Sequence, residues 1–104
     1  MPVLQLSSGD RIEIFISDHE PINWTAANAV CAELGQGWRI PTIFELKEMF
    51  SHKSEFDFAN YGFGDYWSCE AAGENKVHCI NGVDGSVYAC EKEDSQYVRL
   101  VRSL

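Results

Sequence analysis

The segment Gly37-Trp38-Arg39-Ile40-Pro41-Thr42-Ile43-Phe44-Glu45-Leu46 (residues 37–46) carries the strongest local structural signal in this chain of 104 residues. Thr42 and Glu45 have the T-x-x-E spacing of a capping box, in which each side chain satisfies a backbone N–H group at the start of a helix. The predicted helix has one apolar face, formed by Ile43, Leu46, Met49 and Phe50. We expect its polar face to consist of Glu45, Lys47 and Glu48.

Another helix is predicted before this segment, from Trp24 to Leu34. Asn23 or Thr25 can cap its start, and Gly35 can end it, because glycine adopts the backbone conformation that terminates a helix. Its apolar stripe consists of Trp24, Ala27, Cys31 and Leu34, with Val30 beside it. Closer to the N-terminus, residues 3–6 and 11–16 flank the turn-forming residues 7–10 and show strand-like alternation, which predicts a β-hairpin.

The last third of the chain has the alternation and the turn residues of antiparallel strands. Strands are expected at residues 66–69, 76–81, 87–91 and 97–101, and Asp84-Gly85 is a strong hairpin-turn signal. The order is then an N-terminal hairpin, two helices, a long loop and C-terminal antiparallel strands. Because no linker or repeat interrupts this order, we expect residues 1–104 to form a single α+β domain.

A long connection, residues 51–65, precedes these strands, and connections of this length often carry function. An aromatic segment, residues 56–67, contains six aromatic side chains: Phe56, Phe58, Tyr61, Phe63, Tyr66 and Trp67. Since six aromatic rings cannot all be idle in water, some must pack and others are candidates for ligand contacts. We therefore expect this segment to bind a protein or glycan ligand.

Four parts of the chain together resemble the DUF1566 (Lcl C-terminal domain) family. They are residues 24–34 with Cys31, residues 38–42 with Glu45 and Leu46, Tyr66-Trp67-Ser68, and Val98-Arg99-Leu100-Val101-Arg102. The hairpin exit Gly85-Ser86-Val87-Tyr88 and its distance from the terminal Val-Arg pattern are also similar to that family. The order of these motifs along nearly the whole chain is what makes the resemblance specific.

The resemblance implies a C-type-lectin-like fold, in which the two termini share a sheet, helices flank it and a variable long loop carries the ligand contacts. It also implies a binding or adhesion domain. Secreted relatives carry a cysteine at the position of Leu100, where it is expected to pair with the cysteine of the first helix. Because Cys31 lacks this partner, the resemblance favours a reducing compartment. With no signal-peptide pattern at the N-terminus, we expect a cytoplasmic protein of a bacterial or phage-infected cell, unless the chain is a domain excised from a secreted protein.

The chain has sixteen acidic and eight basic residues, which give it a formal net charge of −8. This charge repels phosphate backbones and anionic lipids, so we expect no direct nucleic acid or membrane partner. One alternative function is inhibition of a host protein by covering its basic, nucleic-acid-binding surface. The candidate contacts for this alternative are Glu70, Glu74, Glu91, Glu93 and Asp94. The same acids also suit a solvated surface that keeps a small protein soluble.

The four cysteines, Cys31, Cys69, Cys79 and Cys90, are compatible by number with two disulfides. If Asp84-Gly85 forms a two-residue turn, Cys79 lies opposite Cys90 as a hydrogen-bonded pair, whose Cα separation suits a disulfide poorly. We therefore expect free, mostly buried thiols. A zinc site that combines Cys69, His78, Cys79 and Cys90 is disfavoured, because adjacent strand residues point to opposite faces of the sheet.

Neither calcium binding nor catalysis is supported by a motif. Residues 20–23, Glu-Pro-Ile-Asn, are superficially similar to the Glu-Pro-Asn of calcium-dependent sugar lectins, but they precede the first helix, where we expect a capping turn. The three histidines lie in separate segments, and no phosphate loop or nucleophile elbow is present. Arg39, Arg99 and Arg102 are expected to pair with acids at sheet or helix edges. We expect a calcium-independent, non-enzymatic binding module without metal or cofactor, and assembly through an exposed sheet edge stays open.

Overall fold

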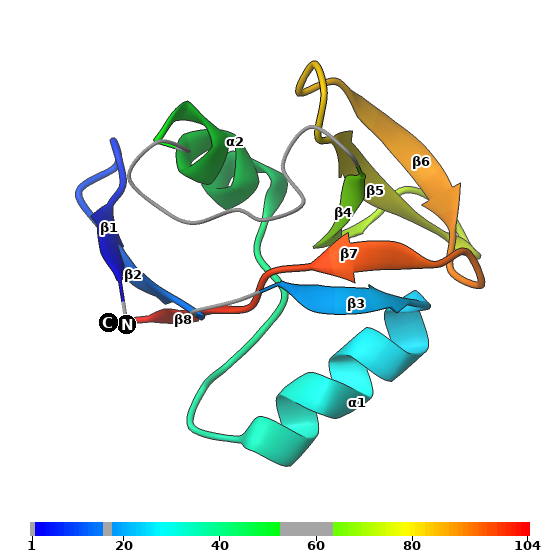
Figure 1. The fold of residues 1–104 in the computed structure, drawn as a ribbon, viewed down its shortest axis with the longest axis horizontal. Helices are drawn as coiled ribbons and strands as arrows, with labels where there is room; N and C mark the ends of the chain where they lie inside the picture. The colour runs from blue at the N-terminus through cyan, green and yellow to red at the C-terminus, as the bar shows by residue number, and fades with distance from the viewer. Residues whose placement is uncertain (1, 16–17, 53–63) are drawn as a thin grey trace.

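The structure, a computed structural model, describes residues 2–15, 18–52 and 64–104, which form two helices and eight strands. The elements are β1 (Val3–Gln5), β2 (Arg11–Ile14), β3 (His19–Ile22), α1 (Trp24–Leu34), α2 (Ile43–Ser51), β4 (Asp65–Ala71), β5 (Lys76–Asn81), β6 (Val87–Glu91), β7 (Gln96–Val98) and β8 (Val101–Ser103). Figure 1 shows a small sheet on the left and a larger sheet on the right, with α2 above and α1 below. The α+β class and the bounds of α1, β5 and β6 agree with the sequence prediction.

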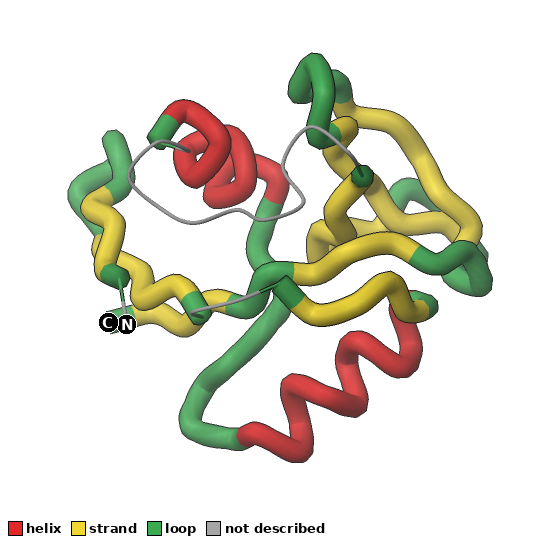
Figure 2. The backbone as a smooth tube through the Cα atoms, in the orientation of Figure 1, coloured by secondary structure: helices red, strands yellow, loops and turns green. Residues whose placement is uncertain are grey.

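The strands form two sheets. The smaller sheet has the order β1-β2-β8, so the two ends of the chain share it, and the larger sheet has the order β3-β7-β4-β5-β6. β7 lies between β3 and β4, antiparallel to the first and parallel to the second. The predicted strand 97–101 is therefore wrong as one unit, because the chain leaves the larger sheet after Val98 and joins the smaller one at Val101 (Figure 2).

The segment before α1 also differs from the prediction. Glu20 and Pro21 belong to strand β3 rather than to a turn, and the pairing of β3 with β7 is irregular between His19 and Ile22. This suits a strand at the edge of a sheet, where the missing N–H of proline costs no ladder bond. Asn23 caps α1 as expected, since its Oδ1 accepts a hydrogen bond of 2.8 Å from the Ala26 N–H.

Two apolar cores lie on opposite faces of the larger sheet. The first contains Leu4, Leu6, Ile12, Ile14, Leu46, Met49, Phe50, Tyr66, Ile80 and Val101. The second contains Ala27, Cys31, Trp38, Ile40, Trp67, Val77, Cys79, Cys90, Val98 and Leu100. Because side chains alternate along a strand, β4 sends Tyr66 into one core and Trp67 into the other. Helix α2 thus covers one face and α1 the other, although Leu34, predicted to be buried, is 41% exposed.

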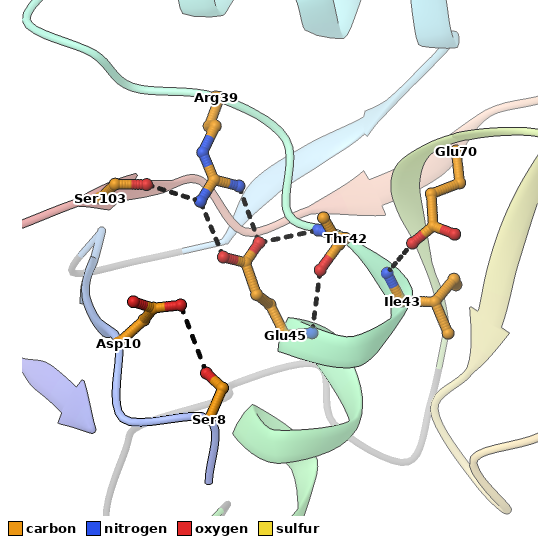
Figure 3. A network of polar contacts seen from close by, with 8 residues as sticks. All are labelled: Ser8, Asp10, Arg39, Thr42, Ile43, Glu45, Glu70 and Ser103. Atoms are coloured by element: carbon orange, nitrogen blue, oxygen red, sulfur yellow. Dashed lines mark hydrogen bonds and ion pairs between the residues drawn. The ribbon is translucent and has the colours of Figure 1, made fainter. Parts of the chain in front are cut away.

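The capping box of α2 is present, and its glutamate is also part of a larger network (Figure 3). Arg39 donates two hydrogen bonds of 2.7 Å to the two carboxylate oxygens of Glu45, and a further one of 2.9 Å to the Ser103 hydroxyl. Glu45 is therefore only 6% exposed, which corrects its predicted place on the polar face. Burial by itself raises the pKa of Glu45, but the hydrogen bonds from Arg39 and Thr42 outweigh it and hold the pKa below its ordinary value.

A second ion pair is fully buried where the two sheets meet. Arg99 Nε lies 3.0 Å from Asp18 Oδ1, and both side chains are 2% exposed. The Tyr66 hydroxyl donates a hydrogen bond of 2.6 Å to the other oxygen of the same carboxylate. Burial, followed by this bond to Asp18, raises the pKa of Tyr66. The predicted pairing of Arg99 with an acid is confirmed, but in the interior rather than on the surface.

Replacing Glu45 by glutamine keeps the shape of the side chain and removes its charge. At pH 7 we expect Glu45→Gln to lower the free energy of unfolding by about 1–3 kcal/mol, because it weakens charge-assisted hydrogen bonds. A depressed folded-state pKa stabilises the fold above the ordinary pKa of about 4.3, and this contribution is lost as the pH falls through the folded-state value. The difference in the free energy of unfolding between the variant and the unsubstituted chain, measured by urea denaturation, should narrow from pH 5 to about pH 3. A difference that stays constant over this pH range would contradict the prediction. The control is Glu33→Gln, at an exposed position.

The Asp18–Arg99 pair is tested by Asp18→Asn, which removes the negative charge beside the buried guanidinium of Arg99. We expect a loss of about 3–5 kcal/mol in the free energy of unfolding. The matched control is Glu13→Gln, because Glu13 pairs with Arg102 at 2.6 Å where the side chains are 15% and 29% exposed. More exposed pairs contribute about 0–1 kcal/mol. Equal losses in the two variants would rule out a special role for the buried pair.

Candidate functional site

Four of the five predicted acidic contacts lie together at one end of the larger sheet. Glu74 lies in the turn 72–75 between β4 and β5, Glu91 ends β6, and Glu93 and Asp94 lie in the turn 92–95 between β6 and β7. The two turns are neighbours because β5 pairs with β6, with Lys76 opposite Glu91. All four acidic residues are exposed. We name this group, Glu74, Glu91, Glu93 and Asp94, the acidic end.

Backbone hydrogen bonds hold the two turns in place. The Lys92 N–H donates to the Asn75 carbonyl over 3.0 Å, which joins one turn to the other. Asp94 folds back onto the end of β6, since its N–H donates to the Glu91 carbonyl at 3.0 Å and its Oδ2 accepts from the Glu91 N–H at 3.2 Å. The acidic end is thus built on backbone held by hydrogen bonds.

The charges of the acidic end are only partly balanced. Lys76 Nζ lies 3.8 Å from a Glu91 carboxylate oxygen, and both side chains are half exposed, so the pair contributes about 0–1 kcal/mol. Lys92 donates to the backbone carbonyl of Glu74 at 3.4 Å rather than to its carboxylate. Within the described part of the chain the carboxylates of Glu74 and Glu93 have no partner, which leaves them available to another molecule.

A shallow hollow of about 520 Å³ adjoins the acidic end at the start of α1. It is lined by Asn23, Thr25, Ala26, Ala29, Asn75, Lys92 and Glu93. The Trp24 N–H donates to the Lys92 carbonyl at 3.0 Å, and the Lys92 ammonium lies 5.2 Å from the centroid of the Trp24 ring. The start of α1 therefore packs against the turn 92–95 and helps to hold that turn in place.

Glu70, the fifth predicted acidic contact, has a structural partner. Its Oε2 accepts a hydrogen bond of 2.7 Å from the Ile43 N–H, one of the free backbone donors at the start of α2 (Figure 3). A carboxylate at this position also interacts favourably with the helix dipole. We therefore do not include Glu70 in the acidic end.

The aromatic segment is described only at its last two members. Phe56, Phe58, Tyr61 and Phe63 lie outside the described residues. Tyr66 and Trp67 have no exposed surface, and the Trp67 Nε1–H donates to the Ile22 carbonyl at 2.7 Å. They belong to β4, which has a strand on each side and a core on each face, so in this structure neither can contact a ligand. Their predicted ligand-binding role is corrected to a role in the cores.

Strand β6 provides a surface that the sequence prediction did not include. It lies at the edge of the larger sheet, and its first three residues, Val87, Tyr88 and Ala89, are exposed. The Tyr88 hydroxyl donates to Asp65, and partial burial followed by this bond raises the pKa of Tyr88. The bounds of β6 were predictable from turns and alternation, but its edge position was not, since it depends on where β7 inserts.

The four cysteines are free thiols, of which Cys69 is exposed and the other three are buried. The predicted register is wrong by two residues, because Cys79 lies opposite Tyr88 and Cys90 opposite Val77. The turn is longer than two residues. The Asn81 N–H donates to the Ser86 carbonyl at 2.8 Å, so the paired strands end at these two residues and the turn runs from Gly82 to Gly85. Burial, and then the neighbouring Cys90 thiol, raise the pKa of Cys79. Such thiols stay protonated and are poor nucleophiles.

Metal ligation finds no support among the described residues. No group of three His, Cys, Asp or Glu side chains in residues 2–15, 18–52 and 64–104 could hold a metal ion. Asn23, the last residue of the Glu-Pro-Ile-Asn segment, uses its side chain to cap α1. His78 lies on the opposite face of β5 from Cys79, and its Nδ1 is buried with no hydrogen-bond partner among the described residues.

A second hollow, of about 200 Å³, lies between α1 and the β3–β7 edge of the larger sheet. It is lined by Phe15, Asp18, His19, Val30, Leu34, Val98 and Leu100. Its lining is mostly apolar, and the Asp18 carboxylate at its side is already engaged by Arg99 and Tyr66.

Neither described helix is long and apolar enough to cross a membrane.

Comparisons with known proteins extend this description. The model of the Lcl C-terminal domain family matches residues 7–102. Six chains of solved structures match the fold. One belongs to the complex of a mutant von Willebrand factor A1 domain with botrocetin, with a TM-score of 0.60, 10% sequence identity, and 91% of each chain covered. At this identity the likeness concerns the fold alone. A search of curated proteins finds no match.

Because the buried Nδ1 of His78 has no partner in the part of the chain that the structure describes, an apolar residue at this position is expected to stabilise the fold. We expect His78→Leu to leave the free energy of unfolding unchanged or to raise it by up to about 2 kcal/mol, because a buried polar atom without a partner costs about 1–3 kcal/mol. His19→Leu is the control, since His19 Nδ1 lies 2.8 Å from the Glu20 carbonyl. Urea denaturation measures both. A loss above about 1 kcal/mol in His78→Leu would contradict the absence of a partner.

Proposed function

The chain belongs to the Lcl C-terminal domain family, and from this premise we propose that it is a non-enzymatic binding domain for a protein with a basic surface. The observation that carries the proposal is the acidic end, where the end of β6 and the two adjacent turns bring four exposed acidic residues together. Those of Glu74 and Glu93 have no partner in the described part of the chain. Free carboxylates on a hydrogen-bonded backbone are suited to contact lysine and arginine side chains of another molecule.

The overall charge favours the same class of partner. A net charge of −8 accelerates the encounter with a basic surface and slows the encounter with nucleic acids or anionic lipids. The nucleic-acid-binding surface of another protein is a natural target, because it presents the basic groups that phosphates otherwise occupy. In this role the domain acts by covering that surface.

Several observations support binding rather than catalysis. The buried thiol of Cys79 has a raised pKa and is a poor nucleophile. The three histidines are on separate elements, His19 in β3, His52 after α2 and His78 in β5. A catalytic site needs a base within hydrogen-bond reach of a nucleophile or a substrate proton.

A second candidate function rests on the aromatic segment. Phe56, Phe58, Tyr61 and Phe63 are dense enough in the sequence to form a stacking surface for a glycan or an anchor for a protein, without calcium. This proposal is independent of the acidic end. Tyr61→Ala combined with Phe63→Ala removes two of these rings and separates the two candidates.

Charge reversal at the acidic end tests the first candidate. The double variant Glu74→Lys, Glu93→Lys should lower the recovery of basic proteins from a cell extract, quantified by mass spectrometry, by about tenfold or more, because like charges then face each other. The matched control is Glu20→Lys with Glu33→Lys, which makes the same change in net charge at other exposed positions. Raising the salt from about 0.1 M to about 0.5 M should weaken recovery by the unsubstituted chain, since screening shortens the reach of charges.

Two results would contradict this function. If the control reduces recovery as strongly as the Glu74 and Glu93 variant, net charge alone matters and the acidic end is not a site. If the recovered proteins are not basic and depend on Tyr61 and Phe63, the aromatic segment is the binding surface instead.

A further inference from the structure

Strand β6 is an open edge of the larger sheet, at the outer margin of the molecule (Figure 1). The other edges of the described sheets are each limited. β3 contains Pro21 and pairs irregularly, β1 has three residues, and β8 is bridged to Arg39. In contrast, β6 has five residues without proline or lysine, and its register with β5 is continuous. Folded proteins normally block such an edge, because it can pair with another strand.

The hydrogen bonds around β6 define which of its backbone groups are free. Asn81 pairs with Ser86 at one end of the β5–β6 ladder, and Asn75 with Lys92 at the other, each through a direct N–H···O bond. Bonded and non-bonded pairs alternate in an antiparallel ladder, so Tyr88 and Cys90 point their N–H and C=O groups toward β5. The backbone groups of Val87, Ala89 and Glu91 therefore point outward.

One of these three outward positions is already occupied. Both backbone groups of Glu91 are bonded to Asp94, through the Asp94 side chain and the Asp94 N–H. Within the described part of the chain, those of Val87 and Ala89 have no partner. Two N–H and two C=O groups at alternate residues form the pattern to which an extended peptide adds as a new strand.

The side chains beside these groups leave the approach open. Val87 is 37% exposed, and Ala89, whose side chain is a single methyl group, is also exposed. Both belong to the same face of β6, because residues two apart along a strand point the same way. Neither carries a charge that would repel an incoming strand or need to be desolvated.

Charge decides which kind of strand fits. Asp84 lies in the turn before β6, Glu91 is the last residue of β6, and Glu93 and Asp94 lie in the turn after it. The open stretch at Val87 and Ala89 therefore has acids at both ends. A second copy pairing antiparallel about Ala89 would bring Asp84 of one chain toward the acidic end of the other. Like charges facing each other across strands are destabilising. A segment with small or β-branched residues between lysines and arginines is complementary at both ends.

We propose that β6 accepts an extended segment of a basic partner protein as a sixth strand of the larger sheet, paired through the backbone of Val87 and Ala89. This inference rests on the proposed function, because the acidic end supplies the charge that selects the segment. It adds the mode of binding: main-chain hydrogen bonds fix the segment, and its flanking cations meet Asp84 on one side and the acidic end on the other.

The experiment uses the full chain and a labelled synthetic peptide, Lys-Arg-Val-Thr-Val-Thr-Val-Arg-Lys, with blocked ends. The control peptide has proline in place of the central valine and the same charge. The test variant is Ala89→Pro, which keeps the ladder to β5 because the lost N–H points outward, yet removes a donor and obstructs the edge. Val87→Lys is a second variant, which leaves the backbone intact and places a positive charge at the edge.

The expected results are specific to strand addition. The valine–threonine peptide should bind at least about tenfold more tightly than the proline peptide, and each variant should weaken its binding by about tenfold or more. Circular dichroism should show at least one variant folded like the unsubstituted chain. On binding, amide hydrogen exchange at Val87 and Ala89 should slow by about tenfold or more, because these groups become paired.

Other results overturn the inference in distinguishable ways. If the two peptides bind equally, or the folded variants bind as the unsubstituted chain does, the acidic end attracts charge without strand addition, and the proposed function stands alone. Absence of peptide binding refutes strand addition, while recovery of basic proteins that depends on Glu74 and Glu93 still supports the function. If sedimentation shows a dimer that Ala89→Pro dissociates, a second copy occupies the edge.

Discussion

The buried pair of Asp18 and Arg99 is the interaction on which the arrangement of the two sheets depends. A guanidinium in the interior needs a counter-charge, and breaking such a pair costs several kcal/mol. Arg99 meets this need through Asp18, which directly precedes β3, and Tyr66 of β4 donates to the same carboxylate. The strands pair at the same place: His19, next to Asp18, lies opposite Val98, and Tyr66 itself lies opposite Tyr97. One carboxylate therefore places β7 between β3 and β4.

Local patterns in the sequence predicted the elements whose stability is decided locally. The bounds of α1, the capping box of α2 and the strands β5 and β6 follow from periodicity, caps and turns within a few residues. Prediction failed where a distant partner changes the environment of a residue. Glu45 was expected in water because glutamate is usually exposed, but Arg39 neutralises it and allows its burial. The break between β7 and β8 contains Arg99, whose partner Asp18 lies 81 residues earlier in the chain.

The candidate site was partly predictable for a related reason. Glu74, Glu91, Glu93 and Asp94 were named from the sequence as residues near strand ends, and the ends of two paired strands meet whatever their exact register. The error of two residues at Cys79 and Cys90 therefore left the acidic end unchanged. Tyr66 and Trp67 could not be assigned correctly, because the sequence does not reveal that β4 has a strand on each side. The position of β6 at the edge of the sheet follows from the same strand order, so it could not be predicted from the sequence either.

The interactions that hold the fold also determine where its charge remains. Arg39, Arg99 and Arg102 pair with Glu45, Asp18 and Glu13, so three of the eight cations are neutralised inside or beside the cores. Each of these pairs removes one positive and one negative charge, and the net charge of −8 is carried by the side chains that remain. Several of them lie at the acidic end, where Lys76 and Lys92 balance the carboxylates only in part. Because β7 lies inside the sheet, β6 is the outermost strand and lies beside these carboxylates. The strand order that completes the two cores therefore also leaves an unpaired strand edge in a region of negative electrostatic potential.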